Sequence, residues 1–323
     1  MAKINRTELL PDRPGVPPMA ALPEAENIDT EALRASVEAG ETDLVCVLGP
    51  TASGKTRYAV SLARELAPAE ILSADSRQVY RGMDIGTGKD LREYGEVPYH
   101  LIDIVPAGAK YNLYEYQRDF SRAYAACRSR GAVPILCGGT GLYIEAATCG
   151  YELSDVPPDE EFRREMEKLS HEELRRRVLD LRPGTPEGVL QSRKRTIRAL
   201  EVAVNEAGGP HREQLVLPSR TFYIGTLVSR EERVERIDRR LDERLEEGLV
   251  EEVRGLLEGG VQPGDLIYYG LEYKFVTQYV TGEISFSEMR ILLENAIHQF
   301  AKRQMTWFRG MERDGVRIHW VKV

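Results

Sequence analysis

The sequence predicts an α/β fold: a mostly parallel sheet with helices on both faces and an inserted helical domain. Two observations predict it. Short apolar runs of strand length alternate with longer helical stretches, the pattern of a parallel sheet built from βαβ units. One polar segment, residues 150–217, interrupts the alternation and is rich in Glu and Arg. At 323 residues and 42% hydrophobic, the chain can bury one substantial core and a small lobe.

Strands and helices are expected at definite places along the chain. The strand candidates are residues 44–48, 71–74, 99–105, 133–137, 222–228 and 317–321. The main helices are expected near 58–66, 231–258 and 285–309, with a short amphipathic one near 29–39.

These elements divide the chain into three parts. The core is expected to comprise residues 43–149 and 218–323, and residues 150–217 form the helical insertion. Pro157-Pro158 and Gly208-Gly209-Pro210 bound the insertion. Residues 1–42 are an N-terminal extension whose proline-rich first part, 1–25, is expected to be disordered.

The first apolar run leads directly into a glycine-rich segment. Residues 49–56 read GPTASGKT and fit the phosphate-loop pattern G-x-x-x-x-G-K-[ST]. Successive backbone N–H groups in such a loop turn toward one oxyanion, and the following helix adds the partial positive charge of its N-terminus. Lys55 can neutralise a terminal phosphate, and the Thr56 hydroxyl can hold Mg²⁺. The fold is therefore expected to be P-loop NTPase-like, with a di- or triphosphate bound by Gly49, Thr51, Ala52, Ser53, Gly54, Lys55 and Thr56.

Polar residues follow two further predicted strands. Asp75 stands at the end of run 71–74, and Thr140 follows run 133–137 in a second strand–glycine turn–helix pattern. Ligands of open parallel sheets bind outside the carboxyl ends of the strands, so both side chains are expected at the phosphate loop. Asp75 could act there as a general base, as a metal ligand, or only as a helix cap.

Six sequence blocks in one order resemble the tRNA dimethylallyltransferases, also called tRNA isopentenyltransferases. They are GPTASGKT, SADSRQVYRGMDIGTGK, HLIDIV, GGTGLYI, RALEV and AKRQMTWFRG, and the resemblance covers about residues 44–321. It implies transfer of a five-carbon group from dimethylallyl diphosphate to N6 of the adenosine immediately 3′ of a tRNA anticodon. Diphosphate is released, and Mg²⁺ is the expected cofactor.

The resemblance also assigns roles to residues. The Asp that matches Asp75 accepts the N6 proton, and general-base help of this kind is typically worth ~10²–10⁴ in rate. Among Arg233, Arg236, Arg240 and Arg244, which recur at helical spacing, the resemblance selects Arg240 to bind diphosphate, and Arg236 is its nearest competitor. Without the resemblance, the many carboxylates of this helix favour the interpretation that its arginines form salt bridges on the surface.

Charge is unevenly distributed along the chain. A net charge of −8 and a pI near 5.4 argue against a protein that grips nucleic acid over its whole surface. Residues 160–200, however, hold eleven basic against eight acidic residues, and residues 302–309 interleave cations with aromatics. Such mixtures suit phosphate contacts and stacking on unpaired bases, although Trp307 and Phe308, each taken singly, favour a core position.

The resemblance places both segments along the anticodon stem-loop. The expected tRNA contacts are Asp75, Ser76, Arg77, Gln78, Arg163, Lys194, Arg195, Arg198, Lys302, Arg303, Gln304, Thr306, Trp307 and Arg309.

Two segments depart from the family pattern. Gln191-Ser192-Arg193 stands where Asn-Asp-Pro is common, which leaves the RNA contacts near residue 193 open. Residues 269–274, YGLEYK, replace the usual Gly-Tyr-Lys/Arg, and Tyr269, Tyr273 and Lys274 all remain candidates to line the substrate tunnel.

The remaining features bear on location and partners. The N-terminus lacks the apolar core of a secretory signal, and no run approaches the ~20 apolar residues of a membrane span. The four cysteines show no C-x-x-C spacing, which favours reduced thiols over a zinc site. A cytoplasmic protein without membrane contact is expected, and a monomer is the default.

Two other enzymes could use the same phosphate loop. An adenylate isopentenyltransferase would prenylate free AMP, ADP or ATP and would not need the basic insertion or the 302–309 segment. A small-molecule kinase would bind ATP in the loop and use Asp75 to deprotonate an acceptor hydroxyl. The DSRQVY and GGTGLYI blocks argue against the kinase.

Overall fold

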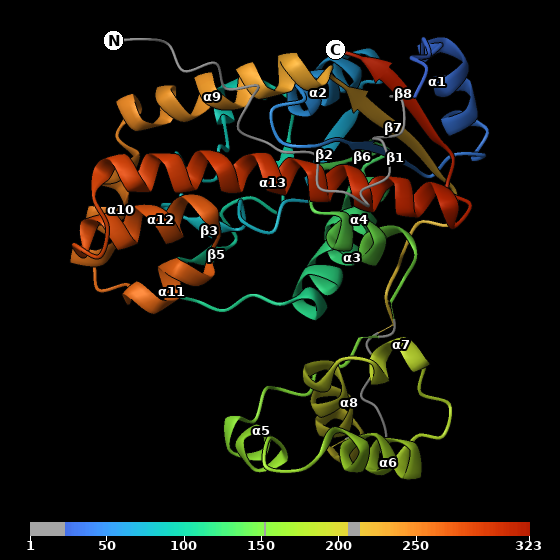
Figure 1. Ribbon diagram of the computed structural model, residues 1–323. Helices are drawn as coiled ribbons and strands as arrows, with labels where there is room; N and C mark the ends of the chain where they lie inside the picture. Colours follow the sequence, from blue (N-terminus) through green and yellow to red (C-terminus); the bar gives the residue numbers. More distant parts are fainter. Residues whose placement is uncertain (1–22, 152, 206–213) are drawn as a thin grey trace.

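A computed structural model describes residues 23–151, 153–205 and 214–323 (Figure 1). Most of the segment expected to be disordered, residues 1–25, lies outside the described residues. So does Gly208-Gly209-Pro210, the expected second boundary of the insertion.

The core contains a six-stranded sheet in which every neighbouring pair is parallel. This confirms the predicted α/β class. The strand order is β4 (Tyr99–His100), β2 (Ala69–Ser73), β6 (Val133–Gly138), β1 (Leu44–Leu48), β7 (Thr221–Leu227) and β8 (Ile318–Lys322).

Helices cover both faces of the sheet, because successive side chains of its buried strands point to opposite sides. Val45 and Val47 of β1 pack in a cluster with α1 (Thr30–Glu38) and α2 (Lys55–Glu65). Leu44, Cys46 and Leu48 pack in a second cluster on the other side. The helices of that second cluster are α3 (Leu113–Ser129), α4 (Gly141–Thr148) and α13 (Phe286–Arg313).

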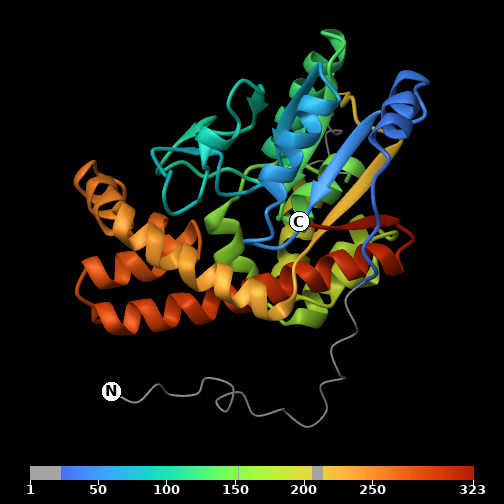
Figure 2. The same cartoon turned by 90° about the horizontal axis from the view of Figure 1, so that it is seen from above.

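A helical end extends the second cluster beyond the sheet. It consists of α9 (Arg230–Glu247), α10 (Leu249–Glu258), α11 (Pro263–Tyr268) and α12 (Leu271–Val280). The long α13 runs from this end past the sheet, and α9 lies along it (Figures 1 and 2). Residues of α9 lie next to the phosphate loop, which begins at the carboxyl end of β1.

Two predicted elements were wrong in detail. The strand expected at 99–105 is split into β4 and β5 (Val105–Pro106), because Leu101 and Asp103 adopt left-handed φ values of 65° and 57° between them. β5 pairs instead with β3 (Tyr80–Arg81) in a separate small sheet, and a 3₁₀ turn, Leu91–Glu93, lies between β3 and β4. The single helix expected at 231–258 is two helices, because Gly248 has a φ of 106° and ends α9.

Residues 160–205 form a separate lobe of four helices, away from the sheet (Figure 1). They are α5 (Glu160–Met166), α6 (His171–Leu181), α7 (Glu187–Leu190) and α8 (Arg193–Asn205). The lobe has its own apolar cluster, centred on Leu174, Val178, Leu190, Ile197 and Leu200. Among the helices in the described ranges, none combines the length and apolarity that a membrane crossing requires.

Candidate active site

The phosphate loop connects β1 to α2, as its sequence pattern predicts. Gly54 immediately precedes α2 with a φ of 82°, and Ala52 also has a left-handed φ of 59°. Ser53 Oγ is buried and lies 2.7 Å from Thr226 Oγ1 of β7. Its hydroxyl therefore anchors the loop to the sheet, and its backbone N–H donates to Pro50 O at 3.3 Å.

The ends of β2 and β6 meet beside this loop. Ala74 N–H donates to Cys137 O at 2.8 Å, and Thr140 N–H donates to Ala74 O at 3.3 Å. Thr140 Oγ1 accepts the backbone N–H of Ser76 at 3.3 Å, so it bridges the two strand ends. The Asp75 Oδ1 atom accepts the N–H of Arg77 at 2.9 Å, which fixes the direction of the carboxylate.

Gln304, which was predicted to contact tRNA, forms two hydrogen bonds within the protein. Its side chain is buried on α13, where Oε1 accepts the N–H of Thr51 and Nε2 donates to Gly139 O, both at 2.8 Å. Both ends of the amide are therefore occupied in holding the phosphate loop against the turn after β6. Sequence reasoning missed this role because residues 51 and 304 are 253 positions apart.

These strand ends enclose an inner cavity of ≈ 300 Å³. The predicted residues that line it are Thr51, Lys55, Thr56, Asp75, Ser76, Arg77, Gln78, Thr140, Arg240, Arg303 and Gln304. Tyr269 and Tyr273 line it as well, whereas Lys274 lies over the ring of Phe275 and is not among the lining residues. One pocket thus holds the predicted base, the loop lysine and the predicted arginine.

A second, outer cavity is lined by residues 52–57 of the phosphate loop and the start of α2. The two cavities share four lining residues: Lys55, Thr56, Arg240 and Arg244. Arg236 lines only the outer one, where it pairs with Glu232 at 2.6 Å and donates to Val323 O at 3.3 Å. The geometry therefore favours Arg240 over Arg236 as the arginine that can reach a group held by Lys55.

Arg244 belongs to the same positive cluster, although the sequence interpretation gave it no role. Its guanidinium pairs with Glu272 at 3.2 Å and donates to Gly86 O at 3.4 Å. Burial lowers the pKa of Arg244, and the neighbouring Arg240 lowers it further. The helical spacing of residues 240 and 244 was the available signal, because it places both on one face of α9.

Burial also lowers the pKa of Lys55, and the nearby Arg240 and Arg244 act in the same direction. The Asp75 carboxylate opposes this shift. Three cations, Lys55, Arg240 and Arg244, converge here, and their carboxylate neighbours are Asp75, Asp90 and Glu272. An anionic ligand beside Lys55 would relieve the repulsion between the cations. Burial raises the pKa of the Cys137 thiol to about 12, so this cavity residue stays an unreactive thiol.

Gly88 makes room for the two arginines. A Cβ on Gly88 would lie 1.8 Å from Arg244 Nη2 and 2.3 Å from Arg240 Nη2, and its φ of 58° is left-handed. Arg240 also pairs with Asp90 at 2.6 Å. The 86–88 segment thus forms the wall against which both guanidinium groups rest.

The predicted tRNA residues of α13 divide between its faces. Lys302, Arg303, Thr306 and Trp307 are exposed, whereas Phe308 is fully buried. The core position favoured for both aromatics is thus confirmed for Phe308 and wrong for Trp307, which is 40% exposed and packs against Gly141 at the start of α4. Arg309 is half-buried.

Two arginine–aromatic pairs flank the inner cavity. Arg77 lies 5.9 Å from the ring centre of Tyr268, and Arg303 lies 5.8 Å from that of Phe300. Tyr268 is 61% exposed, and the sequence interpretation did not select it. Such pairs present flat surfaces beside positive charge.

The predicted basic residues of the lobe are far from this cavity and have two kinds of surroundings. Arg163 and Arg198 pair with the buried carboxylate of Glu201 at 2.9 and 2.5 Å. Lys194 and Arg195 are exposed on α8. The first pair stabilises the lobe internally, whereas the second faces solvent.

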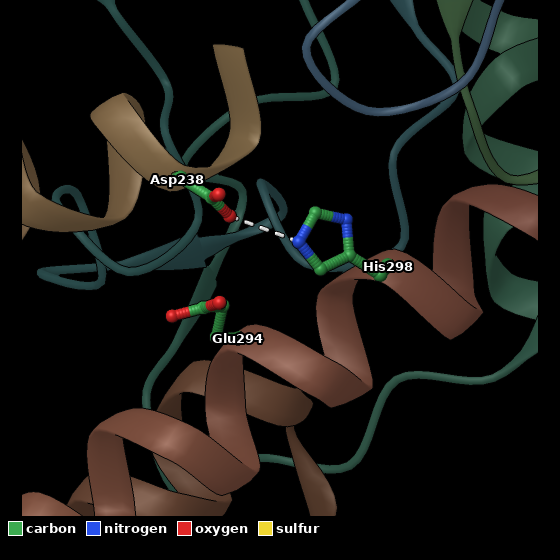
Figure 3. A group of neighbouring side chains, drawn as sticks. All are labelled: Asp238, Glu294 and His298. Atoms are coloured by element: carbon green, nitrogen blue, oxygen red, sulfur yellow. Dashed lines mark hydrogen bonds and ion pairs between the residues drawn. The ribbon is translucent and has the colours of Figure 1, made fainter. Parts of the chain in front are cut away.

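Three side chains between α9 and α13 resemble a cation site. Asp238 points toward Glu294 and His298, and their potential ligand atoms lie within 4.8 Å of one another (Figure 3). His298 Nε2 lies 2.9 Å from Asp238 Oδ1, and Arg290 Nη1 lies 3.6 Å from Glu294 Oε2. We interpret the group as a polar contact between two helices, because a neighbouring arginine already supplies positive charge.

Comparison with known proteins gives consistent matches over most of the chain. The profile of the IPP transferase family matches residues 78–311. A protein of Bacteroides fragilis named tRNA dimethylallyltransferase 2 is 53% identical over 283 residues, which are 86% of this chain and 92% of that protein. A tRNA dimethylallyltransferase 1 of Porphyromonas gingivalis is 53% identical over 282 residues, covering 86% and 93%.

Solved structures agree. The tRNA isopentenylpyrophosphate transferase of Bacillus halodurans superposes with a TM-score of 0.63 at 33% identity, covering 87% of this chain and 89% of that one. A eukaryotic dimethylallyltransferase acting on tRNA gives a TM-score of 0.68 at 19% identity, covering 86% and 73%. At that identity the second match bears on the fold alone.

Proposed function

This chain belongs to the IPP transferase family, and from that premise we propose that it is a tRNA dimethylallyltransferase. It transfers the dimethylallyl group from dimethylallyl diphosphate to N6 of the adenosine on the 3′ side of a tRNA anticodon. The C–O bond to the diphosphate breaks, the N6–C bond forms, and one proton leaves N6.

A single observation carries the proposal. Asp75, Lys55 and Arg240 line one cavity, so a proton acceptor and a cationic diphosphate site face the same space. An adenine amine is a weak nucleophile because its lone pair is delocalised into the ring, and a positioned carboxylate that takes its proton is therefore useful. The cations stabilise the charge that grows on the leaving diphosphate.

Each predicted site residue has a place in this mechanism. Asp75 accepts the N6 proton, and its fixed Oδ1 aims the carboxylate. Thr140 provides a hydroxyl beside it and ties the strand ends together. Lys55, Arg240 and the N–H groups at the start of α2 hold the diphosphate, which lies where the inner and outer cavities share residues.

The donor set also fits Mg²⁺. The Thr56 hydroxyl lines both cavities, the Asp75 carboxylate lines the inner one, and the Asp90 carboxylate lines the outer one. Hydroxyl and carboxylate oxygens are the hard ligands that Mg²⁺ prefers. We propose Thr56 as the ligand from the phosphate loop. When bound, the ion would supply positive charge to the leaving diphosphate.

The tRNA contacts are proposed on three surfaces. Residues 75–78 and the two arginine–aromatic pairs surround the cavity into which the adenosine must be extruded. Exposed residues of α13, Lys302, Arg303, Thr306 and Trp307, continue from the cavity along the helix. The anticodon stem then extends to Lys194 and Arg195 of the lobe. We propose a monomer that works in the cytoplasm on this substrate.

The test is incubation of the purified protein with Mg²⁺, radiolabelled dimethylallyl diphosphate and either total tRNA or AMP. Label at N6 of adenosine in tRNA is the expected result. Label in AMP alone would make the protein an adenylate isopentenyltransferase and would remove the proposed role of the lobe. Label in neither substrate, with ATP stabilising the protein against heat where dimethylallyl diphosphate does not, would favour a kinase.

A further inference from the structure

Glu252 of α10 bonds to a turn that is 166 to 168 positions away in the sequence. Its Oε2 atom accepts the backbone N–H groups of Asp84 and Ile85, both at 2.7 Å. Its Oε1 atom accepts the N–H of Gly86 at 3.1 Å and the hydroxyl of Tyr273 at 2.6 Å. Three successive amides thus converge on one carboxylate, an arrangement that suits a full negative charge.

The same turn carries the carbonyls that contact the active-site arginines. Gly86 O accepts from Arg244 Nη1, and Gly88 O accepts from Arg240 Nη2, both at 3.4 Å. Gly88 O also accepts from Gln78 Nε2 at 3.2 Å. Residues 86–88 all line the inner cavity, so this turn supports the two guanidinium groups together with their carboxylate partners Asp90 and Glu272.

The turn has a second attachment, through Lys89. The buried ammonium of Lys89 donates to Asp84 Oδ1 at 2.6 Å and to Tyr80 O at 2.7 Å, and it also pairs with Asp103. Lys89 therefore ties the turn to β3 and to Asp103. Glu252 holds the amides of residues 84–86 against the helical end, which also carries the arginines on α9.

From these contacts we infer that Glu252 is a positioning residue for diphosphate binding: it fixes the 84–88 turn, whose carbonyls hold Arg240 and Arg244 at the phosphate loop. This inference rests on the proposed function for the identity of the diphosphate ester. Glu252 itself does not line the inner cavity and acts through the turn. Burial and the adjacent Glu252 raise the pKa of Tyr273, so its phenol stays protonated and remains a donor.

The test compares Glu252→Gln with Glu251→Gln in the full-length protein. Glutamine keeps the size of the side chain but removes the charge that three amides share. Glu251 is the neighbouring residue, is exposed and pairs only weakly, at 3.4 Å, with Arg254. The readouts are the Kd for inorganic diphosphate by calorimetry, KM and kcat for each substrate, and hydrogen exchange of amides 84–86.

We expect Glu252→Gln to weaken diphosphate binding about tenfold, the size of one lost charged hydrogen bond. KM for dimethylallyl diphosphate should rise similarly, KM for tRNA should stay within about twofold, and amides 84–86 should exchange faster than in the Glu251→Gln protein. Tyr273→Phe removes one donor to the carboxylate and should give a smaller change in the same direction. Because Tyr273 also lines the inner cavity, faster exchange of amides 84–86 in this variant decides the matter if Glu252→Gln does not fold.

Unchanged diphosphate affinity in a folded variant would overturn the inference, and so would equal losses for both substrates. If the wild-type protein transferred no label yet bound diphosphate with this dependence on Glu252, the proposed reaction would fail while the positioning role stood. The calorimetric measurement keeps the two failures separate.

Discussion

Two carboxylates line the inner cavity, and their surroundings give them different tasks. Glu272 is paired with Arg244 at 3.2 Å, so its charge is used to balance a buried guanidinium. Asp75 bonds through Oδ1 to the backbone of Arg77, which directs the group without neutralising it. Asp75 is therefore the better proton acceptor of the two.

Replacement of Asp75 by Asn should separate binding from chemistry. Asparagine can keep the acceptor for Arg77 N–H but cannot take a proton, so kcat should fall about 10²–10⁴-fold. The Kd values for tRNA and for dimethylallyl diphosphate should change little. Single-turnover assays with separate binding measurements would check this, and near-normal turnover would show that another group is the base.

The two competing arginines of α9 can be separated in the same way. Arg240→Gln should raise KM for dimethylallyl diphosphate about tenfold or more, because a charged hydrogen-bond donor is lost at the phosphate loop. Arg236→Gln is the matched control, since Arg236 lines only the outer cavity and pairs with Glu232. Steady-state kinetics on both variants decide the assignment, and a larger effect at Arg236 would reverse it.

At the scale of elements, one buried carboxylate joins the sheet edge to a helix end. Glu70 of β2 accepts two hydrogen bonds from Arg130 after α3, at 2.5 and 2.8 Å, and lies 2.6 Å from His100 of the edge strand β4. Arg130 first, and His100 after it, lower the pKa of Glu70 from 4.5 to about 2. The ionised group therefore connects three elements.

This pKa shift predicts how stability depends on pH. A carboxyl group whose pKa is lower in the folded state contributes stability above its unfolded pKa and loses it as the pH falls toward the folded value. Glu70→Gln should therefore lower the free energy of unfolding by about 2 kcal/mol at pH 7. The difference from wild type should shrink between pH 4.5 and 2. Urea denaturation across this pH range measures it, and a constant difference would contradict the assignment.

Elements encoded by local patterns were predictable from the sequence. The strand at 44–48, the phosphate loop and the following helix are contiguous in the sequence. Hydrophobic periodicity and the positions of the glycines therefore suffice to predict them. The break after β4 was not predictable, because the left-handed conformations of Leu101 and Asp103 leave no mark in hydrophobicity. Glu252 and Gln304 were also invisible, since each bonds to residues more than 160 positions away.

At the scale of the whole molecule, the lobe contains charges of two kinds. Arg163 and Arg198 surround the buried Glu201, whose Oε1 also accepts the N–H of Asp159 at 2.7 Å. Loss of either arginine leaves a buried carboxylate poorly compensated, so such variants would report on folding rather than on RNA. Composition alone could not separate these arginines from their exposed neighbours, because both kinds occur within one helix.

Lys194 and Arg195 are the residues that test whether the lobe binds tRNA. The double variant Lys194→Ala/Arg195→Ala should raise KM for tRNA, leave KM for dimethylallyl diphosphate unchanged and keep the thermal midpoint, because both side chains are exposed. Each lost phosphate contact should reduce the slope of log K against log salt by about 0.7–0.9.

Arg164→Ala/Lys168→Ala is the matched control, since it removes the same charge from exposed positions in α5 and in the turn that follows it, in the same lobe. Equal salt slopes for the two double variants would mean that the lobe attracts tRNA only through its net charge. A smaller slope confined to the 194/195 variant would place the anticodon stem across the start of α8, with the target adenosine reaching Asp75 from that side.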